Sequence, residues 1–191
     1  MNDDDVAHLI RRLRAGDWDA AEPLARRAGN AALRTAAAAL GDRDAARDIA
    51  QDVAVDVLRG IASLRDPRRF DAWAHRIAVR HTMTALRSRR QRILNEIPLA
   101  DLARGQEPGA LDTTDHGEAA AVRDALAALP PKQHLAMVLR YVHDLTEAQI
   151  ADALGCPEGT ASAYLARARR SLRRSPRLRD LVTAAFFGGV R

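Results

Sequence analysis

The feature that most limits how this chain can fold is a segment near its middle that breaks an otherwise helical pattern. Residues 95–118 hold five prolines and glycines, a density that no regular element tolerates. Acidic residues in the segment also far outnumber basic ones. We therefore expect a flexible acidic linker at 94–118 between two domains, residues 1–93 and 119–176, with a C-terminal tail at 177–191.

Both predicted domains carry apolar residues at helical spacing. Aromatic residues make up only 4% of the 191 residues, so the interior must be built from Ala, Leu, Val and Ile. The clearest apolar stripes run along three segments: Ile49, Val53 and Val57; Leu135, Val138, Leu139 and Val142; and Ala161, Leu165, Ala168 and Leu172. The sequence predicts an all-α protein with two helical domains.

Arginine placement indicates a polyanionic partner. The formal net charge is +5, and only Lys132 among the 30 basic residues is a lysine. Residues 76–92 and 167–179 each contain a cluster of arginines and no acidic residue. One cluster in each domain favours a partner as long as a DNA duplex. The alternative is that each cluster is a solvated helix face that complements the helix dipole.

The predicted helix at 42–58 has the opposite charge. Its acidic and amide residues lie off the apolar stripe, and they are Asp44, Asp48, Gln51, Asp52 and Asp56. Because such a face repels phosphate, it is unsuited to DNA. We expect it to dock on a basic protein surface.

The helix that follows Asp66-Pro67 is suited to nucleic acid. Arg76, Arg80, Thr84 and Arg87 recur every three or four residues and so share one side of it. Trp73 borders this stripe. Two interpretations of Trp73 remain open, a core tryptophan and an aromatic face on which an unstacked base lies.

The second domain shows the pattern of a helix-turn-helix. Thr146 and Gln149 fit a capping box at the start of a short helix, and Gly155 predicts a tight turn after it. A longer helix follows from Glu158 to about Ser171. In a helix-turn-helix this second helix enters the major groove, although any tight pair of helices can imitate the pattern.

Other classes of function find little support. The histidines show no metal-ligand spacing, and no nucleophile triad or glycine-rich phosphate loop occurs, so we expect no catalysis, metal or cofactor. Cys156 has no second cysteine to pair with. No apolar run approaches the roughly 20 residues that span a bilayer, and the N-terminus is acidic. We expect a cytoplasmic protein without membrane insertion.

Several motifs, taken in order, resemble those of extracytoplasmic-function (ECF) sigma factors of the sigma-70 family. They are Asp48-Ile-Ala-Gln-Asp-Val, Phe70-Asp-Ala-Trp-Ala-His-Arg-Ile-Ala, Leu129-Pro-Pro-Lys-Gln, Leu139-Arg-Tyr, Leu145-Thr-Glu-Ala-Gln-Ile-Ala, Gly159-Thr and Ala166-Arg-Ala-Arg-Arg-Ser-Leu. The resemblance spans about residues 6–174. It implies a bacterial transcription initiation factor that binds core RNA polymerase, through its β and β′ subunits, and recognises and helps to open promoter DNA.

The resemblance also implies roles for individual residues. The polymerase-binding residues, which match the surface docking on the β′ clamp, are Asp48, Gln51, Asp52 and Asp56. Those matching the helix that captures the melted minus-ten element are Trp73, Arg76, Arg80, Thr84 and Arg87. Those matching the part that reads the minus thirty-five element are Thr146, Glu158, Thr160, Ser162, Ala163, Tyr164, Arg167 and Arg170.

Two departures from the family pattern affect these roles. Arg80 and Thr84 stand where the family commonly has Asn and Asp, so we expect altered minus-ten recognition. Ser162 and Tyr164 stand where it usually has basic residues. Each missing phosphate contact lowers the slope of log affinity against log salt for duplex binding by nearly one unit. We therefore expect duplex contact that is weak or of unusual specificity.

The same resemblance places the acidic linker in the channels of the polymerase and leaves room for an anti-sigma factor as a further partner. Two alternatives to a sigma factor remain at this point. One is a stand-alone helix-turn-helix regulator, and the other is a protein-interaction module that is inactive on DNA.

Overall fold

A computed structural model describes residues 1–96 and 117–174, which fold into helices without any strand among them. This confirms the all-α class. The first group of helices is α1 (Asp3–Arg14), α2 (Ala21–Leu40), α3 (Arg43–Gly60) and α4 (Phe70–Glu96). The second is α6 (Gly117–Ala127), α7 (Pro131–Val142), α8 (Glu147–Leu154) and α9 (Glu158–Arg173). Single turns of 3-10 helix lie at Trp18–Ala20, Ile61–Ser63 and Pro67–Arg69.

The helices α4 and α6 both extend into the segment 94–118 that the sequence predicts as a linker. α4 ends at Glu96 and α6 begins at Gly117. The remainder of that segment and the tail at 177–191 lie outside the described residues.

Short side chains on α2 allow the first group of helices to pack closely. Ala28, Ala32 and Ala36 are almost completely buried against α3 and α4. The predicted stripe of α3 lies in the same core, with Val53 and Val57 fully buried. Close approach of the helix backbones compensates for the scarcity of large aromatic side chains.

The second core contains residues from both groups of helices. Leu135, Leu139 and Leu165 are fully buried in it, as the spacing predicts. Val79 and Met83 of α4 belong to the same cluster, together with Ala39 of α2. The two groups of helices therefore pack against each other and share apolar surface.

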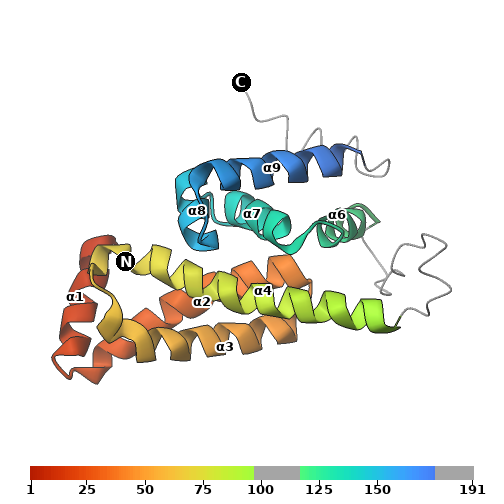
Figure 1. Ribbon diagram of the computed structural model, residues 1–191. Coiled ribbons are helices and arrows are strands. Elements are labelled where there is room, and N and C mark those ends of the chain that lie inside the picture. Colours follow the sequence, from red (N-terminus) through yellow and green to blue (C-terminus); the bar gives the residue numbers. More distant parts are fainter. Residues whose placement is uncertain (97–116, 175–191) are drawn as a thin grey trace.

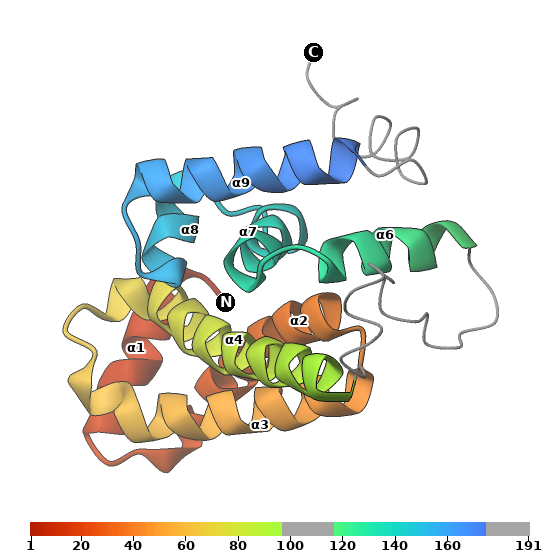
Figure 2. The same cartoon turned by 45° about the vertical axis from the view of Figure 1, so that its right-hand side comes forward.

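Figure 1 shows the arrangement in layers. α3 lies on one side of the molecule and α9 on the other, with α2 and α4 next to α3 and with α7 and α8 next to α9. Figure 2 gives the same order from a second direction. The faces predicted for protein docking and for duplex DNA thus lie on opposite sides of the protein.

Candidate protein and nucleic-acid interfaces

The acidic face of α3 is open to solvent over most of its length. Asp42 caps the N-terminus of the helix, and its carboxylate accepts hydrogen bonds from the backbone N–H groups of Asp44 (3.0 Å) and Ala45 (3.1 Å). Burial of the apolar stripe then fixes which side faces outward. Asp48, Gln51 and Asp52 are all exposed. This side of α3 offers carboxylates to a protein with basic side chains.

Asp56, one turn beyond the exposed carboxylates, faces α4 instead. Its side chain is about one-third exposed (34%), and Oδ2 lies 2.8 Å from Nε2 of His81 and 3.0 Å from Nη2 of Arg80. The contact with His81, followed by the charge of Arg80, holds the pKa of the Asp56 carboxyl below its ordinary value. Asp56 therefore joins α3 to the arginine side of α4.

Trp73 packs on the first core and also keeps part of its ring exposed. Its indole packs in the first core at 6.2 Å, centroid to centroid, from the ring of Phe70. It also covers Gly60 at the end of α3, where a Cβ would stand 3.0 Å from the ring, closer than an ordinary contact. The ring is only half-buried, so part of its surface remains accessible.

An open pocket of about 380 Å³ lies beside this ring. Trp73, Ile77 and Arg80 line it from α4, and Asp56 and Ser63 line it from the opposite side. An aromatic surface next to an arginine is the combination with which proteins hold an unstacked base and its backbone. The 3-10 turn that carries Ser63 is fixed in place by Arg14, which donates hydrogen bonds to the carbonyl oxygens of Ile61 (2.9 Å) and Leu64.

The predicted stripe along α4 is present on its surface. Arg76, Arg80, Thr84 and Arg87 are all exposed. Two of the guanidinium groups are already paired with carboxylates, yet they stay more than half exposed, at 55% for Arg76 and 67% for Arg80. The arginines are thus not buried in ion pairs, and a cationic side of α4 faces solvent.

The second domain contains the predicted helix-turn-helix. The Thr146 hydroxyl accepts from the N–H of Gln149 (3.3 Å), and the Gln149 side chain accepts from the N–H of Thr146 (2.9 Å). This confirms the capping box. Gly155 ends α8 with a φ of +63°, the left-handed conformation that suits glycine. Ser162 of α9 donates a hydrogen bond to Glu147 of α8, which joins the two helices.

Along α9, exposure divides the candidate residues into two sets. Glu158, Arg167 and Arg170 are exposed, whereas Thr160, Ser162, Ala163 and Tyr164 are partly covered. The Tyr164 ring packs against the second core and has the Lys132 ammonium 6.0 Å from its centroid. Arg167 and Arg170 are therefore the candidate basic groups of this helix that are open to solvent.

Sequence reasoning missed a polar contact between the two groups of helices. Arg34 of α2 donates to the carbonyl oxygen of Val142 (2.8 Å) and contacts Nδ1 of His143 (3.0 Å). Nε2 of His143 lies 2.9 Å from the hydroxyl oxygen of Thr35. Its ring also meets His75 of α4 edge to face, with 3.4 Å between the nearest nitrogens. No local pattern signals these contacts, because the partners lie far apart in the sequence.

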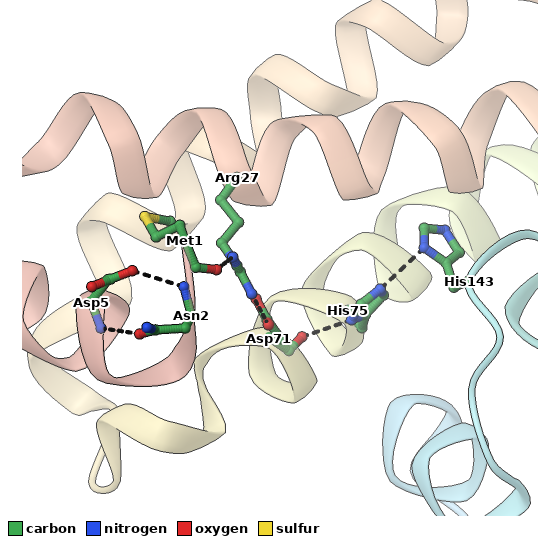
Figure 3. A network of polar contacts seen from close by, with 7 residues as sticks. All are labelled: Met1, Asn2, Asp5, Arg27, Asp71, His75 and His143. Carbon is green, nitrogen blue, oxygen red and sulfur yellow. Dashed lines mark hydrogen bonds and ion pairs between the residues drawn. The ribbon is translucent and has the colours of Figure 1, made fainter.

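Figure 3 shows how His75 is held. Its Nδ1 donates to the carbonyl oxygen of Asp71 (2.8 Å), and Arg27 donates to both oxygens of the Asp71 carboxylate through Nε and Nη2. Burial lowers the pKa of His75 and lowers that of His143 to about 4, with the positive charge of Arg34 acting in the same direction on both. Both rings are neutral at pH 7, which fits their role as hydrogen-bonding groups.

Two further observations concern the described residues only. No group of three or more His, Cys, Asp or Glu side chains within 1–96 and 117–174 is placed to hold a metal ion. In the same residues, no helix is both long enough and apolar enough to pass through a bilayer.

Comparison with known protein families gives two matches. Residues 24–92 match "Sigma-70 region 2", and residues 119–172 match "Sigma-70, region 4". The first match covers most of α2, α3 and α4, and the second covers the helix-turn-helix.

Curated relatives extend over both parts of the chain. An RNA polymerase sigma-E factor of Streptomyces antibioticus is 30% identical over 162 residues, which are 84% of this chain and 86% of the relative. The ECF RNA polymerase sigma factor SigM of Mycobacterium tuberculosis is 33% identical over 168 residues, 88% of this chain and 83% of the relative.

Two solved structures share the fold. CnrH, solved in complex with the cytosolic domain of CnrY, superposes with a TM-score of 0.62 at 21% identity over 94% of this chain and 98% of its own. The sigma factor RpoE of Bartonella quintana, solved with the anti-sigma factor NepR, gives 0.60 at 19% identity over 82% and 95%.

Proposed function

The chain belongs to the ECF sigma factors of the sigma-70 family, which direct RNA polymerase in transcription initiation, and on that premise we propose how its surfaces divide the work. The observation that carries the proposal is the separation of charge between helices. α3 exposes carboxylates on one side of the molecule, while α4 and α9 expose arginines elsewhere. One side suits a protein partner and the others suit a phosphate backbone.

The exposed face of α3 binds core RNA polymerase. Asp48, Gln51 and Asp52 make the direct contacts, because their side chains are free of the first core and exposed. Asp56 contributes from the end of this face and at the same time orients Arg80. Opposite charges at such an interface speed up association and select the partner.

The arginine side of α4 holds the melted minus-ten strand. Arg76, Arg80 and Arg87 bind its backbone, with Thr84 between them, and a flipped base enters the pocket beside Trp73. The guanidinium of Arg80 lies at the pocket, where the family commonly has an amide. This gives a physical basis for altered recognition of the minus-ten element.

The helix α9 binds the duplex at the minus thirty-five element. Arg167 and Arg170 supply phosphate contacts, while Glu158, Thr160, Ser162, Ala163 and Tyr164 lie on or near the N-terminal half that enters the groove. Thr146 acts from the start of α8, where it also caps the helix.

The protein has no catalytic role of its own and acts in the cytoplasm, where the polymerase is. It works by binding the enzyme and by trapping melted DNA. A stand-alone helix-turn-helix regulator would leave the sigma-70 region 2 match over residues 24–92 without a purpose. An anti-sigma factor as a further partner is consistent with the neighbouring RpoE structure, which contains one.

A binding assay with purified core polymerase tests the assignment of α3. The triple variant Asp48→Ala, Gln51→Ala and Asp52→Ala is expected to lose core binding, measured by native gel shift or surface plasmon resonance. A matched control replaces three exposed acidic residues on other elements, Asp19, Glu22 and Asp124, with alanine. Unchanged binding of the first variant, or equal loss in the control, contradicts the assignment.

A further inference from the structure

The second domain occupies part of the proposed DNA surface of α4. Nη2 of Arg76 donates to the carboxylate of Asp152 on α8, and Nε of Arg76 donates to the backbone carbonyl oxygen of the same residue (3.2 Å). Figures 1 and 2 both show the end of α8 directed at α4. The carboxylate thus takes the place at this guanidinium that a DNA phosphate would take.

A second contact holds the same two parts together further along α2. Arg34 and Thr35 of α2 bind the end of α7 through the Val142 carbonyl and the His143 ring, and His75 of α4 touches that ring. In addition to these polar contacts, Ala39 of α2 and Val79 and Met83 of α4 belong to the apolar cluster of the second group of helices. The second group of helices therefore packs against both α2 and α4, and this interface lies next to the proposed strand-binding side of α4.

The polar contacts at this interface are of a strength that DNA can displace. The side chains of Arg76 and Asp152 are 55% and 33% exposed, and ion pairs at that exposure stabilise weakly. Because both partners belong to one chain, however, weak contacts are enough to keep them together. A strand of DNA offers several phosphates at once and so competes effectively with one carboxylate.

We propose that, without DNA, this chain closes on itself and that Asp152 of α8 acts as an internal competitor for the phosphate-binding guanidinium of Arg76. The second domain is in this way an autoinhibitory ligand of α4, and Arg34 helps to keep it in place. The inference rests on the proposed strand-binding function of α4. Opening of the interface then accompanies binding of the melted strand.

Two variants that change the net charge in opposite directions test the closure. Asp152→Asn removes a negative charge near α4, whereas Arg34→Ala removes a positive charge; both remove a contact of the interface. Closure predicts that both variants bind an end-labelled oligothymidine strand more tightly than the wild-type chain, by about two- to five-fold. Charge alone predicts tighter binding for the first and weaker binding for the second. The matched controls are Asp124→Asn on α6 and Arg26→Ala on α2, both exposed.

The opening itself is measured by fluorescence energy transfer in the full chain. Dyes are placed on Arg43→Cys of α3 and Ser171→Cys of α9, both exposed, after replacement of the single native cysteine by Cys156→Ser. Both interface variants are expected to lengthen the distance between the dyes, and the controls are not. Far-ultraviolet circular dichroism checks that helix content is unchanged.

The outcomes separate this inference from the proposed function. Unchanged dye distances in both interface variants, or longer distances without tighter strand binding, overturn the autoinhibition. If Arg76→Ala leaves oligothymidine affinity unchanged in both the wild-type and the Asp152→Asn background, the strand-binding role of Arg76 fails instead. The dye distances still report closure in that case.

Discussion

The indole of Trp73 lies so close to Gly60 that a Cβ at the glycine would stand 3.0 Å from Cζ2 of the ring. Gly60 is the last residue of α3, and its backbone conformation (φ −90°) is open to other residues. Space for the ring, and not backbone conformation, is therefore what a side chain at this position would disturb. The contact fixes the position of the ring beside the pocket of α4.

Gly60→Ala is expected to displace the Trp73 ring and lower the yield of open promoter complexes. The new methyl group would stand 3.0 Å from the ring, so the ring must give way by a few tenths of an ångström. The shift is measured as a change in tryptophan emission in a Trp18→Phe background, because the only other tryptophan, Trp18, is 75% exposed. Potassium permanganate footprinting of promoter DNA measures opening.

Gly29→Ala is the matched control for that experiment. Gly29 also lies in a helix, and its new Cβ would stand at an ordinary 3.5 Å from the Ala50 carbonyl oxygen. It is expected to leave emission and opening unchanged and to stabilise the fold by up to about 1 kcal/mol. Equal opening by Gly60→Ala and wild type would show that the ring position is not needed.

Stability is expected to fall between pH 7 and pH 5 because of His134. The side chain is 2% exposed, and burial lowers its pKa from the ordinary value of 6.5 to about 4. The unfolded chain therefore takes up a proton below pH 6.5 while the folded chain does not, and the free energy of unfolding decreases as the pH falls. His134 alone contributes about 2 kcal/mol to the loss at pH 5.

Urea denaturation of His134→Leu at both pH values measures this contribution. Nε2 of His134 has no hydrogen-bond partner among the described residues, so leucine costs no hydrogen bond of that atom. The variant is expected to lose about 2 kcal/mol less than wild type between pH 7 and pH 5. Parallel pH dependence of the two proteins would assign the effect to other groups, such as His143.

The side chain of Thr146 is expected to matter for stability through its cap. Thr146→Ala removes the acceptor for the Gln149 N–H and should lower the free energy of unfolding by about 1 kcal/mol. Thr146→Ser keeps that acceptor and should restore most of it. Thermal denaturation compares the three proteins, and a duplex-binding assay with the serine variant separates the cap from a DNA contact.

Arg167 and Arg170 are expected to set the salt dependence of duplex binding. Each alanine substitution should reduce the slope of log affinity against log salt by about 0.9, because one phosphate contact is lost. Fluorescence anisotropy with a duplex probe at several salt concentrations measures the slope, with Arg26→Ala as control. An unchanged slope would contradict the proposal that Arg167 and Arg170 contact the duplex.

Local structure was predictable because helix periodicity and helix caps depend on residues that are close together in the sequence. The buried stripe of α9, from Ala161 to Leu172, lies where its spacing places it. The capping box of Thr146 and the turn at Gly155 follow from residue type alone. Val142 is the exception, since it is 36% exposed at the last turn of α7 although the spacing predicts it inside. At the end of a helix, the spacing of apolar residues no longer determines which side chains are buried by neighbouring helices.

Long-range contacts were not predictable. Asp56 reads as one more acidic residue of α3, yet its carboxylate turns towards His81 and Arg80. Tyr164 reads as a groove-facing residue, yet its ring packs on the second core. Each outcome depends on which helix lies alongside, and that is decided by tertiary packing. The residue contacts assigned to polymerase and promoter remain predictions.

The meeting of Arg76 with Asp152 is a first-order event, because one polypeptide carries both groups. Tethering of this kind supplies an effective concentration of the order of millimolar, whatever the number of molecules in the cell. Raising expression would therefore leave the proportion of closed molecules the same. An added ligand, a change in ionic conditions or a substitution at the contact would change that proportion.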